Sequence, residues 1–285
     1  MSIIQKAVQN HSERRVEPKF SDARADAALV TAASAVDRRP SAPAAFAPLV
    51  ANGFLQLEPG DPASRAELRH LKRSILQCAF GPLAEAGANV VMITSAMPGA
   101  GKTFLSANLA QALAMERDRT TLLIDADDTR ATMSRALGLH GEPGFFDLMH
   151  DPKLQLESCL YRSDVPGLDF VPAGSRFDDS LELLTSNRAR DLVHGLANEN
   201  RNRLVVIDCP PLLGTPNAVA LSALAGQILV VVEAGETSQP TISQALELLN
   251  RDKPIGLVLN KVPRAPLLTL AHGSYYYYYA GPEGE

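Results

Sequence analysis

The chain has few cysteines, no excess of positive charge and no long apolar run. Cys78, Cys159 and Cys209 are widely spaced and lack any CxxC or histidine-paired pattern, so we interpret them as reduced structural thiols. A net charge of −5 provides no long-range field for nucleic acid, and no local basic patch is evident, so no nucleic-acid partner is expected. No apolar run approaches the ~20 residues that cross a bilayer. The opening MSIIQKAVQNHSERR lacks the apolar region and cleavage site of a signal peptide, so we expect a cytoplasmic chain.

Aromatic residues are also scarce, at 5% of the chain, yet five of the six tyrosines stand in one run, Tyr275 to Tyr279. Neighbouring side chains of an extended segment point to opposite sides, so these five rings cannot all pack on one surface. Taken alone, the run is consistent with an aggregation-prone or adhesive segment. The motifs in the rest of the chain are needed to choose between that interpretation and a function for exposed tyrosines.

Composition divides the chain into three parts. Residues 1–62 include a stretch rich in alanine and proline with weak periodicity, which predicts a partly disordered arm that tethers the rest. A docking helix for a partner in the first dozen residues is the alternative. Residues 63–263 are expected to form one α/β domain, and residues 264–285 a flexible tail that carries the tyrosines.

The central part alternates between strand-like and helix-like segments. Its apolar runs, each followed by a helical pattern, predict a mostly parallel sheet with helices on both faces. The expected strands are residues 89–95, 120–127, 168–174, 203–211, 227–235 and 255–262, and the expected helices are residues 102–117, 179–198, 216–224 and 240–250. An earlier helix should bury one stripe, formed by Leu68, Leu71, Ile75, Leu76 and Phe80.

A phosphate-binding loop lies between the first strand and its helix. The segment AMPGAGKTF, residues 96–104, fits the [AG]xxxxGK[ST] pattern of a P-loop NTPase. Its glycines let backbone N–H groups surround a polyphosphate, Lys102 reaches the outer phosphates, and Thr103 offers a hydroxyl to Mg²⁺. The expected ATP-binding residues are Met97, Pro98, Gly99, Ala100, Gly101, Lys102, Thr103, Phe104 and, after the last strand, Asn260. For Asn260 an ordinary strand-end turn is the equal alternative.

Three aspartates follow two other strands of the same sheet. Asp208 ends LVVID, and Asp125 and Asp127 follow TLLI with the same orientation on an extended chain. A lone aspartate after a strand usually caps a helix, but three beside a P-loop predict a metal and proton-transfer site. Asp128 is expected to cap the following turn.

These motifs resemble the bacterial tyrosine kinases, and within them the autokinases associated with exopolysaccharide export. The resemblance rests on ITSAMPGAGKTF, on LLIDADDTR as the family's second Walker motif, and on DCPPLL, GQILVVVEAGETSQ, GLVLNK and the tyrosine tail. The family's arginine falls one position later here, at Arg130, with Thr129 in its usual place.

The resemblance implies a protein-tyrosine autokinase that uses ATP and Mg²⁺. It implies that Lys102, Asp125 and Asp127 are catalytic, and that Thr103, Asp125 and Asp208 hold the metal. The phosphoacceptors would be Tyr275, Tyr276, Tyr277, Tyr278 and Tyr279, phosphorylated between subunits of a homo-oligomer such as a ring. It also implies an integral-membrane polysaccharide co-polymerase as partner, and hence a peripheral location at the inner membrane.

Two other functions compete with the kinase. Partitioning and septum-positioning ATPases share this fold, but their P-loop carries a lysine where this chain has Met97, and many end in a basic amphipathic helix, whereas no lysine or arginine follows Arg264. Both differences favour the kinase. A catalytically weak nucleotide-binding regulatory subunit of the co-polymerase stays open, because intact motifs show capacity and not turnover.

Overall fold

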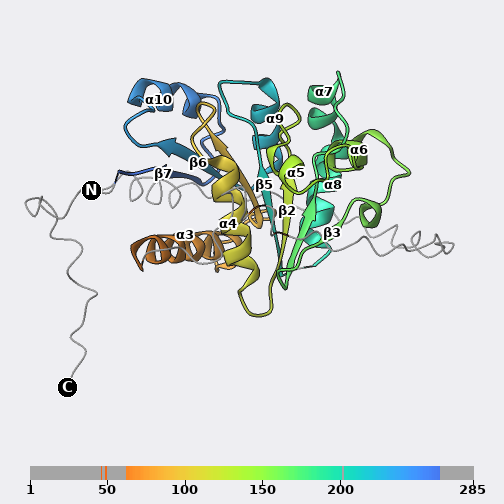
Figure 1. Cartoon of the computed structure of the whole chain (residues 1–285), viewed down its shortest axis with the longest axis horizontal. Coiled ribbons are helices and arrows are strands. Elements are labelled where there is room, and N and C mark those ends of the chain that lie inside the picture. The colour runs from red at the N-terminus through yellow and green to blue at the C-terminus, as the bar shows by residue number, and fades with distance from the viewer. Residues whose placement is uncertain (1–45, 47–48, 50–61, 201, 264–285) are drawn as a thin grey trace, which may run out of the picture.

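The computed structural model describes residues 46, 49, 62–200 and 202–263. A seven-stranded sheet in the order β3-β4-β2-β5-β1-β6-β7 runs through its centre (Figure 1). The strands are β1 (Val90–Ser95), β2 (Thr120–Asp125), β3 (Tyr161–Arg162), β4 (Leu168–Val171), β5 (Arg203–Asp208), β6 (Gln227–Glu233) and β7 (Ile255–Asn260). All are parallel except β3, which pairs antiparallel with β4 at one edge. The expected mostly parallel sheet is confirmed.

The central strands are apolar on both faces because each face meets a helical layer. On β1, Val90 and Met92 enter one buried cluster, while Val91 and Ile93 enter the other. Alternate residues of a strand point to opposite faces, so a strand buried on both sides must be apolar throughout. The sheet is therefore the middle of three layers.

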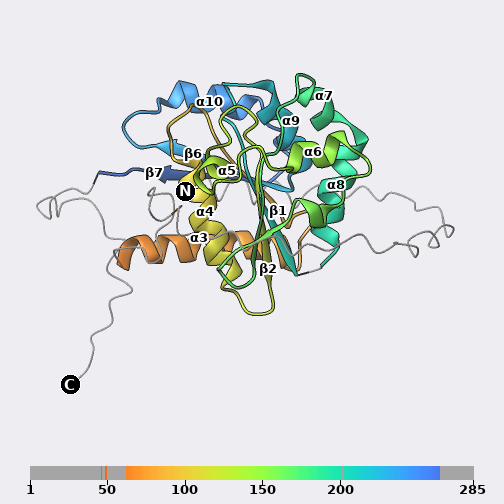
Figure 2. The same ribbon diagram turned by 45° about the vertical axis from the view of Figure 1, so that its right-hand side comes forward.

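Helices cover both faces, as expected. The layer on one side is formed by α3 (Pro62–Phe80), α4 (Lys102–Ala114) and the short α5 (Thr132–Ala136). The layer on the other is formed by α6 (Phe145–His150), α7 (Ser180–Thr185), α8 (Asn187–Asn198), α9 (Pro216–Leu224) and α10 (Gln239–Glu247). Figure 2 shows α3 crossing α4 near the C-terminal end of α4. The stripe predicted for α3 packs as expected, with Ile75 buried and its neighbours partly buried.

The helix expected over residues 179–198 is in fact two helices. Ser186 interrupts it with an extended backbone, at φ −69° and ψ 156°, and its Oγ accepts a hydrogen bond from the N–H of Ala189. Serine stabilises a helix start in this way, so α8 begins anew after Ser186. The two-residue strand β3 and the short helix α6 were not predicted, since both are too short to show a period.

Two residues of the expected N-terminal arm lie in the core. Phe46 is 1% exposed, its ring meets Phe170 edge to face at 6.4 Å, and its N–H donates to Asp164 Oδ1 at 3.1 Å. Leu49 is fully buried in the same cluster. The arm is therefore attached to the sheet layer at this point.

Other expectations from composition can be checked as well. None of the three cysteines, all of them described, is in a disulfide; Cys159 and Cys209 are buried and Cys78 is half-buried. Over residues 62–263 as described, no helix has the length and apolarity to cross a membrane. The expectation that the chain has no local basic patch was wrong, because one groove is lined by Arg69, Lys72, Arg73 and Arg119. Arg69, Lys72 and Arg73 share one helix and are close in the sequence, whereas Arg119 comes from a distant segment that the sequence could not place beside them.

Candidate active site

The P-loop leaves β1 at the carboxyl edge of the sheet and enters α4. Ser95 fixes its start, donating from Oγ to the carbonyl of Met97 at 2.6 Å. Met97, Pro98 and Gly99 are exposed, whereas Ala100 and Lys102 are buried, and Thr103 and Phe104 are half-buried in the first turn of α4. The N–H groups of a first helical turn have no partners within the helix, so this turn is built to receive an anion.

Glycine is required at two positions of this loop. Gly99 and Gly101 have φ of 92° and 95°, in the left-handed region that other residues rarely adopt. A Cβ on Gly101 would overlap the side-chain amide of Asn260. That amide donates from Nδ2 to the carbonyl of Ala100 at 2.8 Å. Asn260, which we expected beside the nucleotide base, thus has a defined contact that holds the loop itself.

Asp125, at the end of β2, is completely buried and held on both oxygens. Its Oδ2 accepts from the N–H and the hydroxyl of Ser134 at 2.9 and 2.7 Å, and its Oδ1 accepts from the N–H of Asp127 at 3.2 Å. Burial raises the pKa of Asp125 to about 6, against these hydrogen bonds, which lower it. Ser134 was not foreseen, because it comes nine residues later on α5.

Asp208 stands next to Asp125, at the end of the adjacent strand β5. Its Oδ1 accepts from the hydroxyl of Ser106 at 2.9 Å. Burial, and then the negative charge of Asp125, raise the pKa of Asp208 to about 7, while hydrogen bonds from Thr103 and Ser106 and the charge of Lys102 act the other way. Two neighbouring buried carboxylates therefore resist ionising together.

Asp127 differs from these two in having a free oxygen. Its Oδ1 accepts from the N–H groups of Thr129 and Arg130 at 3.2 and 2.9 Å, while no described residue bonds Oδ2. It is 8% exposed and carries one of the charges beside Lys102. Burial lowers the pKa of Lys102, and the carboxylates of Asp208 and Asp127 raise it. One lysine and the carboxylates thus share a nearly dry edge.

The donor set fits a phosphate-bound Mg²⁺ better than a metal held by protein alone. Within the described ranges, no group of three histidine, cysteine or acidic side chains is placed to hold a metal ion. The Thr103 hydroxyl, in the first turn after the P-loop, lowers the pKa of Asp208, which ends the strand beside that loop. Oxygen ligands of this kind suit Mg²⁺, which takes one or two protein ligands together with phosphates.

Asp128 does not cap the following turn, so that expectation was wrong. Its Oδ2 accepts from the hydroxyl of Ser180 at 3.0 Å and from the amide of Asn217 at 2.9 Å, on α7 and α9. These contacts tie the loop after β2 to the opposite helical layer. Arg130 is exposed, and its charge lowers the pKa of Lys102. Tyr275 to Tyr279 lie outside the described residues.

Comparison with known proteins identifies the family. A family model described as an AAA domain matches residues 88–254. The chain is 31% identical over 172 residues to the tyrosine-protein kinase YwqD of Bacillus subtilis, covering 60% of this chain and 71% of that protein. It is also similar to the solved BceF tyrosine kinase domain, with a TM-score of 0.62, 30% identity, and coverage of 76% of this chain and 87% of that one. The chain belongs to the bacterial tyrosine-kinase family.

Several relatives in the bacterial tyrosine-kinase family are much longer. The tyrosine-protein kinase ptk of Acinetobacter johnsonii is 29% identical over 195 residues, which make up 68% of this chain but 26% of that protein. The chain spans about a quarter of the length of the first curated relatives that it matches. It corresponds to the part that folds as the kinase domain, since it covers most of the solved BceF domain.

Proposed function

We propose that this member of the family is an ATP-dependent protein-tyrosine autokinase that phosphorylates its C-terminal tyrosines. The observation that carries the proposal is the grouping of Asp125, Asp127 and Asp208 at one edge of the sheet, with Lys102 of the P-loop among their charges. Phosphoryl transfer needs little covalent chemistry from the protein, only alignment and neutralisation of charge. A lysine that binds the phosphates neutralises their charge and aligns them, and a carboxylate accepts the proton of the tyrosine.

The hydrogen bonds favour Asp127 as the proton acceptor. Both oxygens of Asp125 are already occupied, whereas Oδ2 of Asp127 has no partner among the described residues, and Asp127 is 8% exposed where Asp125 is completely buried. A general base must come within hydrogen-bond reach of the hydroxyl that it deprotonates. In this proposal Asp125 orients the backbone of Asp127 and contributes negative charge near the metal.

Thr103 and Asp208 are the residues that would hold Mg²⁺ beside the nucleotide, with Asp125 contributing its negative charge from behind Asp208. The ion supplies charge neutralisation on the phosphates when bound. Lys102 binds the outer phosphates, and the N–H groups of residues 99–103 surround them. Ser106 keeps the Asp208 carboxylate turned toward this edge, at 2.9 Å.

The proposal has three further parts. One subunit's tyrosines are phosphorylated by a neighbour in a ring, and the phosphorylation controls exopolysaccharide polymerisation and export. An integral-membrane co-polymerase is the partner that keeps the kinase peripheral at the inner membrane. Their support is family membership together with the tyrosine run in residues 275–279. Each phosphate would add about −1.5 to −2 charges to that segment.

Incubation of the purified chain with ATP and Mg²⁺, followed by mass spectrometry of the C-terminal peptide, tests the function. The expected result is phosphate on one or more of Tyr275 to Tyr279, lost in the Lys102→Met variant. The experiment is repeated with the cytoplasmic segment of a co-polymerase present. Absence of phosphotyrosine from the wild type in both settings would refute the kinase and favour the regulatory subunit.

A further inference from the structure

A basic groove lies between α3 and the segment that follows α4. Its volume is about 510 Å³, within the range of small-ligand sites. Four positive side chains line it, against one carboxylate: Arg69, Lys72, Arg73 and Arg119 against Glu116. Since the whole chain carries a net charge of −5, this concentration of positive charge is a local feature that the overall balance conceals.

The groove combines a flat apolar wall with donors that are not fully used. The guanidinium carbon of Arg119 lies 3.5 Å from the centroid of the Phe80 ring, and Leu76 also contributes to the lining. One terminal nitrogen of Arg119, Nη1, is buried without a hydrogen-bond partner in the part of the chain that the structure describes. Arg69 and Arg73 are exposed, while Lys72 pairs with Glu116 at 2.5 Å. A buried donor without a partner is costly, and an anionic ligand that reorders the guanidinium would supply that partner.

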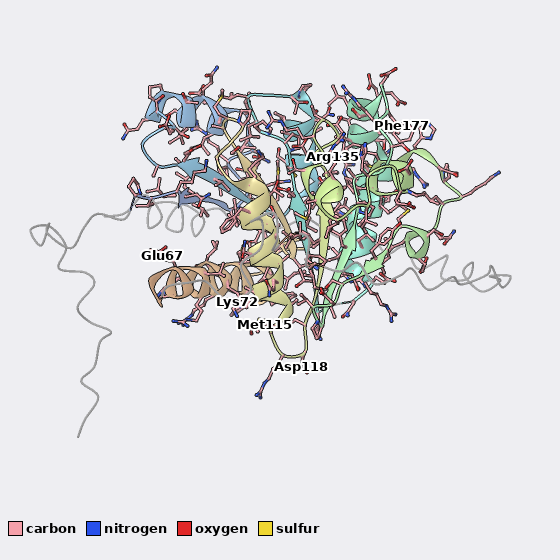
Figure 3. All side chains as sticks on the ribbon, viewed as in Figure 1. Glu67, Lys72, Met115, Asp118, Arg135 and Phe177 are labelled. Atoms are coloured by element: carbon pink, nitrogen blue, oxygen red, sulfur yellow. The ribbon has the colours of Figure 1, made fainter. Side chains whose placement is uncertain are left out.

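This groove is separate from the active site. α4 begins at Lys102 beside the P-loop and ends at Ala114, just before Glu116 and Arg119. A helix of 13 residues is about 20 Å long, so the two sites stand at opposite edges of the sheet. Figure 3 shows Lys72 and Met115 together at one end of α4, with Arg135 beyond the other.

We propose that the groove binds phosphotyrosine, namely the phosphorylated C-terminal run of this chain or of a second copy. Arginine pairs with a phosphate through two parallel hydrogen bonds, and the phenyl ring of a phosphotyrosine can stack on the guanidinium plane of Arg119, which covers Phe80, and contact Leu76. An unphosphorylated tyrosine has no charge to offer Arg69, Arg73 and Arg119. The groove therefore distinguishes the product of the kinase reaction from its substrate, and in this respect the inference rests on the proposed function.

The chain is long enough for this contact. Eleven residues lie between Pro263, the last described residue, and Tyr275, a span of up to about 40 Å. That distance exceeds the length of α4, so the run can reach the groove of its own chain as well as that of a neighbour. A phosphorylated run held there is withdrawn from the active-site edge.

Binding of a synthetic peptide tests the inference directly. The full chain, treated with phosphatase and kept without ATP, is titrated into a fluorescent peptide of residues 274–285 phosphorylated at Tyr277, and anisotropy is recorded. We expect binding at least about tenfold tighter than that of the unphosphorylated peptide. The difference should shrink as salt rises, because the pairing charges are partly exposed.

The Arg69→Gln/Arg73→Gln double variant should weaken binding of the phosphopeptide by about tenfold. Both side chains are exposed, so the fold is retained. Arg119→Gln is the second variant, with a thermal melt to check its fold, since it also loses the contact with Phe80. The matched control is Arg190→Gln/Arg251→Gln, which removes two exposed charges from elements on the other face of the sheet and should change the affinity less than twofold.

Several outcomes would overturn the inference: equal affinity for both peptides, a double variant that binds like the control, or tighter binding of a single-stranded oligonucleotide than of the phosphopeptide. Full competition by millimolar inorganic phosphate, with no contribution from the tyrosine ring, would reduce the site to a simple anion site and would also refute it. The peptide is synthetic, so binding does not require kinase activity. A chain that binds it but forms no phosphotyrosine contradicts the proposed function alone, and an active kinase that ignores it contradicts this inference alone.

Discussion

The two edges of the sheet carry opposite charge in opposite surroundings. At the carboxyl edge, Asp125 and Asp208 are buried beside one lysine. At the amino edge, Arg69 and Arg73 are exposed beside one glutamate. The same helix, α4, joins the two.

The difference shows what burial adds to a charge. Buried carboxylates next to one another have raised pKa values, so ionising both at the carboxyl edge costs folding free energy, which a bound cation would lower. Exposed arginines keep their charge in water at little cost and are screened by salt. The carboxyl edge is therefore suited to chemistry, and the amino edge to reversible binding.

The largest expected effect is at Asp127. Asp127→Asn removes the proposed proton acceptor while keeping its size, and we expect the initial rate of tail phosphorylation to fall by about 100-fold or more. The measurement is incorporation of phosphate from labelled ATP over time. Asp252→Asn makes the same change at an exposed position before β7 and should leave the rate unchanged. A similar loss in both variants would remove Asp127 from the mechanism.

The next effect concerns stability at the same edge. In the folded chain the pKa of Asp208 is raised to about 7 from its ordinary 3.8. As pH rises from about 4 to 7, both carboxyls ionise first in the unfolded chain, so the wild type loses stability over this window at Asp208 and at Asp125, whereas Asp208→Asn loses only the part due to Asp125. Without nucleotide or Mg²⁺, the variant should gain at least about 1 kcal/mol over the wild type between pH 4 and pH 8, or roughly 3 °C in Tm.

Thermal melts across this pH range provide the test. Asp252→Asn is again the matched control, because an exposed carboxylate should show no such trend. A constant difference in Tm between Asp208→Asn and the wild type would mean that Asp208 ionises normally in the folded chain.

A smaller effect is expected where β7 supports the P-loop. Asn260→Ala removes the 2.8 Å hydrogen bond to Ala100, and we expect ATP binding to weaken about fivefold, as for the loss of one hydrogen bond of ~1 kcal/mol. Titration with a fluorescent ATP analogue measures this. Asn250→Ala, at an exposed turn before β7, should change the affinity less than twofold. Equal affinities would leave Asn260 as a strand-end residue without a role at the site.

The smallest effect tests the amino edge. Glu116→Gln removes the only carboxylate that lines the basic groove and frees Lys72 from its ion pair. Affinity for the phosphorylated peptide should increase about twofold to threefold, in keeping with the small energies of partly exposed pairs. Weaker binding would show that the pair itself shapes the groove.

Local pattern predicted most of this fold. The apolar runs located every parallel strand. The central strands are apolar because both of their faces are buried, and the edge strand β7 is apolar as well although Leu257 and Leu259 are exposed. The P-loop and the strand-end aspartates placed the active site at one edge, as parallel sheets do. The break at Ser186 was missed, because a serine inside an amphipathic pattern can lie within a helix or cap one. Only the hydrogen bond from the N–H of Ala189, seen in the structure, shows that it is a cap.

Long-range contacts could not be predicted. Ser134 reaches Asp125, and Asp128 reaches Ser180 and Asn217, through the packing of layers and not through any local spacing. The basic groove is similar, since Arg73 and Arg119 meet only because α3 crosses α4. Net charge over the whole chain cannot reveal such a site.

The bond between Asn260 and the P-loop also fixes where the last segment of the chain starts. Because Asn260, the last residue of β7, bonds the loop at 2.8 Å, the tyrosine run is tied to its own active-site edge by a tether of at most about 50 Å. A group confined in this way has an effective concentration of the order of millimolar, whatever the concentration of protein. Phosphorylation by a neighbour must compete with transfer to the tyrosines of the same chain. A phosphorylation rate per chain that rises with protein concentration would therefore indicate transfer between subunits. A rate per chain that stays constant would indicate transfer within one subunit.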